Sequence, residues 1–219
     1  MFNVSSRKTI KVKTAKGRKL SSTRWLQRHL NDPYVTKARE DQYRSRAAYK
    51  LLEIDQKYQL LKKDSVVVDL GAAPGSWSQI VAEKANRVIA VDLLDMRPLE
   101  GVDIIKGDFT SNDVITTIKE LLGQKKVDLI LSDMSPNISG NKNLDHLKIM
   151  NLAEMVIQFA KEHINCGGNI VIKIFQGQDL EPFIKMVQET FGASVKYFKP
   201  ISSRKESSEI YIVILNINY

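Results

Sequence analysis

A glycine-containing turn between an apolar run and a helical pattern is the first feature of the sequence that suggests ligand binding. The apolar run at residues 65–70 leads into Gly71-Ala72-Ala73-Pro74-Gly75 and then into a helix near Trp77. Glycine lets the backbone adopt positive φ and lets a ligand approach the main chain closely. By itself, the turn is equally consistent with a tight strand-to-helix connection that binds nothing.

Acidic residues at the ends of neighbouring predicted strands narrow the choice of ligand. Asp92 closes the next strand, twenty-one residues after Gly71, and Asp108 follows the third. A carboxylate in the place of Asp92 can accept hydrogen bonds from two ribose hydroxyls. The turn is G-x-x-x-G, not the G-x-G-x-x-G of dinucleotide sites, and its acidic surroundings suit no pyrophosphate. A cationic nucleoside such as S-adenosylmethionine fits better, because carboxylates can bind its amino group, its ribose and its adenine amine.

Lys173 stands in an unusual place for a lysine and is a candidate for proton transfer. Lys173 interrupts the apolar run 170–175, where a lysine at a sheet edge or one reaching to solvent would be the ordinary interpretation. A central strand seldom contains a lysine without a function, so we favour catalysis. Lys50 lies beside the apolar face of a predicted helix, while Asp133 and Glu209 adjoin predicted strands. Taken singly, Lys50 would be a surface residue and each acid would be open to either interpretation.

The elements that must position these residues alternate between strands and helices. Apolar runs predict strands at 65–70, 87–92, 102–106, 127–132, 168–175, 194–199 and 209–216, and helical patterns occur at 77–85, 111–122, 144–163 and 179–191. Right-handed crossovers then build a doubly wound, mostly parallel sheet covered by helices on both faces. The last two strands have only a loop between them, which predicts an antiparallel hairpin at one edge.

The first 64 residues precede this α/β core and are expected to be helical after a basic arm. We predict a flexible arm at 1–20, a first helix that ends at Asn31-Asp32-Pro33, and a second helix from about Ser45. These two helices (21–64) and the core (65–219) are expected to form one domain (21–219). Trp25, Tyr34 and Tyr43 could stack on bases, although core packing is the simpler role for each.

Positive charge is concentrated at the N-terminal end. The chain has 219 residues and a formal net charge of +8, yet residues 1–50 alone carry +11 and contain no acid before Asp32. Such a run is often only a solvated surface, but its length favours a nucleic-acid partner. A cleaved mitochondrial transit peptide is the alternative for this segment.

Cysteine content and hydropathy exclude several other classes. The single cysteine, Cys166, rules out an internal disulfide, and with only three histidines no Cys/His metal-ligand spacing exists. The sequence has no apolar stretch of about 18 residues and no secretory signal. We therefore expect a cytoplasmic monomer without a metal or a membrane partner.

Five motifs in order along the chain resemble the FtsJ family of methyltransferases. They are Arg44-Ser45-Arg46-Ala47-Ala48-Tyr49-Lys50-Leu51, Asp69-Leu70-Gly71-Ala72-Ala73-Pro74-Gly75, Ser132-Asp133-Met134-Ser135-Pro136-Asn137, Val171-Ile172-Lys173-Ile174-Phe175-Gln176-Gly177, and Ser202-Ser203-Arg204 through Glu209-Ile210-Tyr211. The likeness runs from about Ser21 to the C-terminus. It implies the class I S-adenosylmethionine-dependent methyltransferase fold, with seven strands and the last one antiparallel. Within the family, the resemblance is to enzymes that methylate the ribose 2′-hydroxyl of a uridine in large-subunit ribosomal RNA.

The resemblance also implies roles for individual residues. The family's catalytic Lys-Asp-Lys-Glu set corresponds to Lys50, Asp133, Lys173 and Glu209. Its cofactor contacts correspond to Gly75, Trp77, Asp92, Asp108 and Asp133, to which the turn adds Gly71. The family commonly has Gly-Gly-Trp where this chain has Gly75-Ser76-Trp77. Ser76 therefore departs from the family pattern at a position where a glycine lets the cofactor approach the backbone closely.

Methyl transfer from a sulfonium to a ribose hydroxyl is an in-line displacement that needs a proton acceptor. The pKa of a free lysine amine is about 10.4. Burial and nearby positive charge lower such a pKa, whereas carboxylates raise it. We therefore expect Lys173 to be the base, Lys50 to tune it electrostatically, and Asp133 and Glu209 to position the two lysines.

Three other functions remain open at this stage. A transfer-RNA ribose methyltransferase would use the same catalytic set, although the short chain favours ribosomal RNA. An RNA-binding protein that has lost turnover is disfavoured by the intact set of four residues. A nicotinamide oxidoreductase is disfavoured by the G-x-x-x-G spacing.

Overall fold

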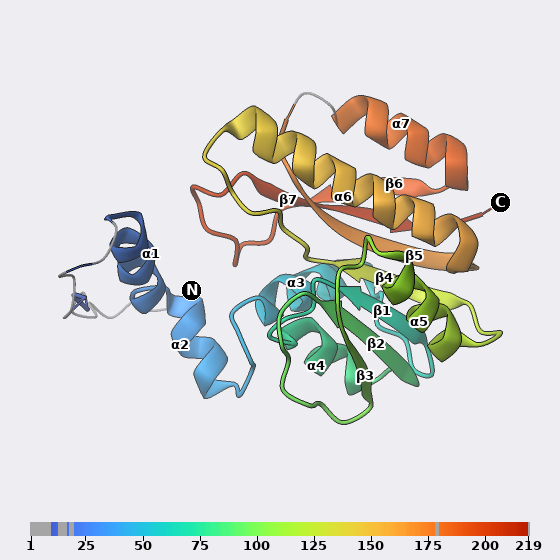
Figure 1. The fold of residues 1–219 in the computed structure, drawn as a ribbon, viewed down its shortest axis with the longest axis horizontal. Helices are drawn as coiled ribbons and strands as arrows, with labels where there is room; N and C mark the ends of the chain where they lie inside the picture. Colours follow the sequence, from blue (N-terminus) through green and yellow to red (C-terminus); the bar gives the residue numbers. More distant parts are fainter. Residues whose placement is uncertain (1–9, 13–16, 18–19, 178–179, 219) are drawn as a thin grey trace.

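The computed structural model describes residues 10–12, 17, 20–177 and 180–218 of the chain. Its helices are α1 (Leu20–Leu30), α2 (Pro33–Glu40), α3 (Ala48–Tyr58), α4 (Ser76–Ala82), α5 (Asn112–Leu122), α6 (Lys142–His163) and α7 (Leu180–Phe191). Its strands are β1 (Val66–Leu70), β2 (Arg87–Asp92), β3 (Val102–Lys106), β4 (Val127–Ser132), β5 (Ile164–Phe175), β6 (Ser194–Phe198) and β7 (Glu209–Leu215). Figure 1 shows the course of the chain through them.

The strands form one seven-stranded sheet in the order β3-β2-β1-β4-β5-β7-β6. β1 pairs in parallel with β2 and β4, and β4 pairs in parallel with β5. β7 is antiparallel to both of its neighbours, β5 and β6, and lies between them. The predicted doubly wound sheet with an antiparallel last strand is therefore confirmed. The edge strand of the terminal hairpin is β6, because β7 is inserted beside β5.

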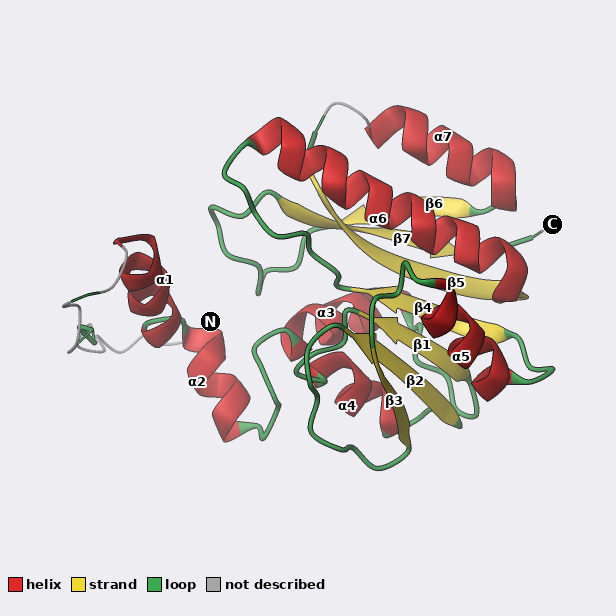
Figure 2. Ribbon diagram, viewed as in Figure 1, coloured by secondary structure: helices red, strands yellow, loops and turns green. Residues whose placement is uncertain are grey.

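Helices cover both faces of the sheet, as the nearly continuous apolar strands require. One core joins strand residues such as Val68 and Ile130 to buried residues of α5, α6 and α7. The other joins alternate strand residues such as Val67 and Leu129 to buried residues of α3 and α4. Figure 2 shows these helices arranged around the sheet.

The N-terminal region contains one helix more than the sequence predicted. After α1, the chain starts again at α2, whose N-cap is Asp32, with Pro33 in the first turn. The segment Asn31-Asp32-Pro33 was interpreted only as the end of a helix, yet Asp followed by Pro is also a favourable helix start. Figure 1 shows α1 and α2 set apart from the α/β core.

Most of the predicted arm, residues 1–20, lies outside the described residues. The part that is described contacts α1: the backbone N–H of Ile10 donates to Asn31, and that of Val12 donates to Gln27. At least this stretch is therefore held against the first helix.

Candidate active site

The four predicted catalytic residues come from four separate elements and meet at the carboxyl end of the central strands. Asp133 directly follows β4, and its N–H donates to the carbonyl of Leu70 at the end of β1. Lys173 lies in β5 and Glu209 begins the antiparallel β7. Lys50 reaches them from α3, the helix that packs over this face of the sheet.

Ion pairs join these four side chains into one cluster. Lys173 Nζ lies 3.1 Å from Asp133 Oδ1 and also donates to the Asp133 main-chain carbonyl. Lys50 Nζ lies 2.9 Å from Glu209 Oε1 and 4.0 Å from Asp133 Oδ1. The Lys173 side chain is only 7% exposed and that of Lys50 is 12% exposed. Two ammonium groups and two carboxylates thus balance in a largely buried site.

Tyr211 completes the cluster, although the sequence did not single it out as a site residue. The register of β5 and β7 places Tyr211 opposite Lys173. Its hydroxyl donates to Asp133 Oδ1 at 2.6 Å, and its ring packs against Trp77. Burial and the nearby Asp133 carboxylate raise the pKa of Tyr211 well above its ordinary value, so the hydroxyl keeps its proton and remains a donor.

Electrostatics keep Asp133 ionised despite its burial. Burial alone would raise its pKa, but Lys173, Lys50 and the Tyr211 hydrogen bond outweigh that effect, and the pKa of Asp133 is lowered overall. A permanent negative charge can therefore hold both ammonium groups in place.

The glycine turn lies against the segment that carries Asp133. Gly71 has φ +74°, and a Cβ there would lie 2.8 Å from the main-chain N and Cα of Met134. Gly75 has φ +99° and caps α4. Glycine at these positions permits close packing of main chains, which keeps the turn next to the catalytic cluster.

Asp92 and Asp108 lie at neighbouring strand ends beside this turn. Asp92 accepts from the N–H of Ala73 at 2.9 Å and from that of Leu94 at 2.8 Å. The N–H of Gly107 donates to the Asp92 carbonyl, which links the two strand ends. Asp108 is exposed, and hydrogen bonds from the Thr110 N–H and hydroxyl lower its pKa. Both carboxylates can accept further hydrogen bonds from a ligand.

Trp77 and Ser76 direct their side chains away from any ligand in the turn. The Trp77 side chain is 2% exposed, and its indole N–H donates to the Ala47 carbonyl at 2.8 Å. A cofactor contact at Trp77 would therefore go through its main chain. The hydroxyl of Ser76 lies 2.6 Å from that of Ser45, so the extra side chain is accommodated in contacts with the segment before α3.

Arg44 is a further residue that the sequence did not assign to the site. Its guanidinium donates to the carbonyls of Pro74 (3.1 Å), Arg97 (2.8 Å) and Pro98 (2.7 Å). It therefore ties the glycine turn to the loop after Asp92. These contacts span 30 to 54 residues of sequence, so only the fold reveals them.

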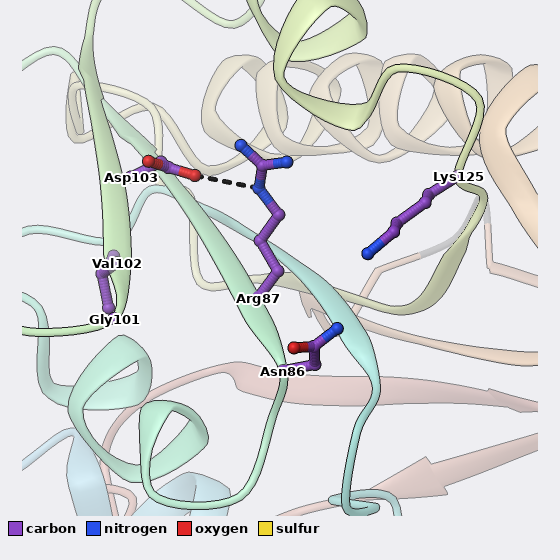
Figure 3. A pocket seen from close by; sticks show the side chains of 6 residues that line it. All are labelled: Asn86, Arg87, Gly101, Val102, Asp103 and Lys125. Carbon is purple, nitrogen blue, oxygen red and sulfur yellow. Dashed lines mark hydrogen bonds and ion pairs between the residues drawn. The ribbon is translucent and has the colours of Figure 1, made fainter.

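The opposite end of the sheet carries a separate surface pocket. Figure 3 shows it lined by Asn86, Arg87, Gly101, Val102, Asp103 and Lys125, at the start of β2 and β3. An ion pair between Arg87 and Asp103 crosses it.

Within the described part of the chain, no group of three or more His, Cys, Asp and Glu residues could hold a metal ion. No helix in that part is long and apolar enough to cross a membrane.

Comparisons with known proteins give consistent results. Residues 43–217 match the model of a family described as FtsJ-like methyltransferase. A ribosomal RNA large subunit methyltransferase E from Wolbachia sp. subsp. Brugia malayi (strain TRS) is 51% identical over 203 residues, which cover 93% of this chain and 92% of that protein. A protein of the same name from Rickettsia bellii (strain RML369-C) is 46% identical, with 95% of each chain covered.

Solved structures resemble the chain as well. A Plasmodium falciparum protein described as a ribosomal RNA methyltransferase superposes with a TM-score of 0.71 and 35% identity, covering 80% of this chain and 98% of that one. A Streptococcus mutans protein described as a methyltransferase in complex with SAH superposes with a TM-score of 0.50 over 78% of this chain, at 14% identity, a likeness of fold alone.

Proposed function

Because the chain belongs to the FtsJ-like methyltransferase family, we propose that it transfers a methyl group from S-adenosylmethionine to a ribose 2′-hydroxyl of a uridine in large-subunit ribosomal RNA. The names of the relatives support the ribosomal substrate. The observation that carries the reaction type is the convergence of Lys50, Asp133, Lys173 and Glu209 beside the glycine turn. We also propose that the protein acts as a monomer. Such a substrate implies action in the cytoplasm, at the large ribosomal subunit.

The residues around the turn fit S-adenosylmethionine. The carboxylates of Asp92 and Asp108 stand at adjacent strand ends, where they can bind the ribose hydroxyls and the adenine amine. Gly71 and Gly75 place no side chain in the turn. At Trp77 the indole is engaged with the Ala47 carbonyl, so the main chain is the part that a ligand can contact. Asp133, after β4 on the other side of β1, would supply negative charge for the cationic part of the ligand. Bound there, the cofactor supplies an electrophilic methyl carbon activated by the sulfonium, and its product is S-adenosylhomocysteine.

The protein's own groups align the hydroxyl and take its proton. We assign proton acceptance to Nζ of Lys173 in its neutral form, because Asp133 and its carbonyl fix this atom at the centre of the site. Lys50, held by Glu209, adds positive charge beside it and stabilises the negative charge that develops on the 2′-oxygen. Asp133, fixed by Tyr211, keeps Lys50 and Lys173 at their positions.

Mapping 2′-O-methyl nucleotides in ribosomal and transfer RNA, from cells with and without the gene, tests the substrate. We expect one uridine of the large-subunit RNA to lose its methyl group without the gene. Purified protein with S-adenosylmethionine should restore it on RNA from the deficient cells. A missing methyl group in transfer RNA alone would replace ribosomal RNA by transfer RNA as the substrate, and unchanged maps of both would overturn the proposal.

Substituting Asp92→Ala tests the cofactor site. Losing hydrogen bonds worth roughly 1–3 kcal/mol should weaken cofactor binding about five- to a hundredfold. Calorimetric titration with S-adenosylhomocysteine measures this effect directly. Asp95→Ala is the matched control, because Asp95 is three residues further along the chain, its side chain is 83% exposed, and its ion pair within the described residues is with Lys106. Equal affinities of the two variants would mean that Asp92 does not contact the cofactor.

A further inference from the structure

Asp32 is a buried acid at the junction of α1 and α2 that contacts two arginines from distant parts of the chain. The residue is 8% exposed. One carboxylate oxygen caps α2 by accepting from the Tyr34 N–H at 3.1 Å. The other oxygen pairs with Arg46, just before α3, and with Arg204 Nε at 3.4 Å. One carboxylate therefore joins the N-terminal helices to the catalytic half of the molecule.

Arg204 belongs to the loop between β6 and β7, residues 199–208, which leads directly into Glu209. The same loop is held by Arg46, which donates to the Ser202 carbonyl, and by Glu53, which accepts from the Ser202 N–H at 2.9 Å. At its far end, Glu206 pairs with Arg28 of α1 at 3.4 Å. The loop and the two N-terminal helices thus form one continuous wall beside the catalytic cluster, and Figure 1 shows the loop reaching towards α1 and α2.

This wall carries more positive than negative charge. α1, α2, Asp32 between them and the loop hold seven basic residues against three acids; they are Arg24, Arg28, Lys37, Arg39, Lys199, Arg204 and Lys205, against Asp32, Glu40 and Glu206. Arg46 and Arg204 share a single carboxylate, that of Asp32. Arg39 is exposed and has no ion pair with any residue that the structure describes. Guanidinium groups with donors to spare favour phosphate ligands.

The wall is also close to the proposed reaction centre. Arg46 is four residues before Lys50, and the loop leads directly into Glu209. In RNA, the ribose 2′-oxygen is adjacent to the 3′-phosphodiester. An RNA whose 2′-hydroxyl reaches Lys173 therefore brings a phosphate close to the cluster that the loop enters at Glu209.

We propose that Asp32 is a positioning residue that fixes α1, α2 and the 199–208 loop as one wall, from which Arg39 and Arg204 bind the RNA phosphates next to the target nucleotide. This inference rests on the proposed function, because it takes RNA as the substrate. The proposal means that the negatively charged Asp32 favours the binding of RNA, which is itself negatively charged. This is possible only because Asp32 orients the arginines that contact the phosphates.

The substitution Asp32→Asn separates positioning from simple electrostatics, because the two predict opposite signs. Asparagine keeps the helix cap but removes the ion pairs and one negative charge, so the net charge rises by one. Electrostatics alone predicts tighter RNA binding. We expect weaker binding, with the dissociation constant for a large-subunit RNA fragment raised about three- to tenfold, and a higher KM for RNA at unchanged cofactor affinity. The control Glu40→Gln makes the same charge change at an exposed position of α2 and should tighten binding slightly.

A second variant keeps the test decisive if Asp32→Asn does not fold. Arg204→Gln should lower RNA affinity and reduce the slope of log affinity against log salt by about one. Adding Asp32→Asn to Arg204→Gln should cause less further loss than Asp32→Asn causes alone. RNA affinity in Asp32→Asn equal to or above the wild-type value, or an unchanged salt slope in Arg204→Gln, would overturn the inference. Wild-type protein that binds RNA but methylates none would instead refute the proposed function.

Discussion

Lys173 and Asp133 show how a charged pair can exist in the middle of a sheet. Lys173 is enclosed by apolar strand neighbours, and an unpaired ammonium group there would be strongly disfavoured. Asp133 compensates that charge at 3.1 Å, and Tyr211 and Lys50 hold Asp133 in turn. Buried ion pairs are a poor source of stability, so their retention here is best explained by function.

Replacing Lys173 by alanine should abolish methyl transfer and spare cofactor binding. The variant lacks the proton acceptor, while the glycine turn and Asp92 remain unchanged. Single-turnover methylation at saturating RNA, together with titration of S-adenosylhomocysteine, measures both properties. Near-normal turnover would exclude Lys173 as the base.

Asp69 should make the stability of the fold dependent on pH. It is fully buried in β1, where burial raises its pKa from 3.8 to about 7 in spite of a 2.6 Å hydrogen bond from Ser78. A carboxyl group with a raised folded-state pKa favours the folded state while it is protonated. Its contribution is therefore greatest below about pH 4 and is lost as the pH rises through about 7. Urea denaturation at about pH 5 and about pH 8 should show a larger loss of unfolding free energy in the wild type than in Asp69→Asn. Equal losses would mean that Asp69 titrates normally.

The four residues of the cluster could be selected from the sequence because each lies in a short local motif, and the structure brings them together. Asp32, Arg44 and Tyr211 could not, because their roles depend on partners far away in the chain. The Asp32–Arg204 contact, for example, spans 172 residues. In the sequence, Tyr211 is one of several strand residues with no distinguishing feature. Only the register of β5 and β7 shows that it lies opposite Lys173.

At the scale of elements, the strands were predictable and the N-terminal helices were less so. A buried parallel strand produces a continuous apolar run, and each of the seven runs corresponds to a strand. β5 begins at Ile164, four residues before its predicted start. The sequence did not predict this extension because residues 164–167 lack such a run.

α2 has eight residues and only Ala38 is buried, so its sequence shows little helical periodicity. It is held instead by ring packing of Tyr34 on Tyr49, a packing role that Tyr43 shares. The side chain of Trp25 lies outside the described residues.

Arg44 connects two elements of the cofactor site, so its loss should weaken cofactor binding more than RNA binding. Arg44→Ala removes three hydrogen bonds that hold the glycine turn against the loop at 93–98. We expect the dissociation constant for S-adenosylhomocysteine to rise about tenfold. The control Arg97→Ala also removes one arginine charge but keeps the main-chain carbonyl that Arg44 contacts. It should change the cofactor affinity little. Gly75→Ala should resemble Arg44→Ala, because a Cβ there would lie 2.9 Å from the Arg44 guanidinium. Unaltered cofactor affinity in Arg44→Ala would assign it a purely structural role.

At the scale of the whole molecule, charge is unevenly distributed along the chain. Residues 1–50 carry +11 and the remaining 169 residues carry −3. The acids of the second part include Asp92, Asp108 and Asp133 around the proposed cofactor site. The proposed RNA-binding wall lies on the side of α1 and α2, so the cationic cofactor and the anionic RNA would each meet charge of the opposite sign.

The basic residues before α1 should extend that wall along the RNA backbone. Residues 1–19 contain seven of them, Arg7, Lys8, Lys11, Lys13, Lys16, Arg18 and Lys19, and no acid. Each neutralised phosphate adds roughly 0.7 to 0.9 to the slope of log affinity against log salt, so four contacts add about three units. Deleting residues 1–19 leaves α1 complete and should weaken RNA binding and flatten its salt dependence. Cofactor affinity and thermal stability of the core should be unchanged, because buried residues of both cores begin only at Ala48. A solvated tail or a cleaved targeting peptide predicts instead that both proteins bind RNA with the same affinity and the same slope, and a salt series on the two proteins distinguishes these outcomes.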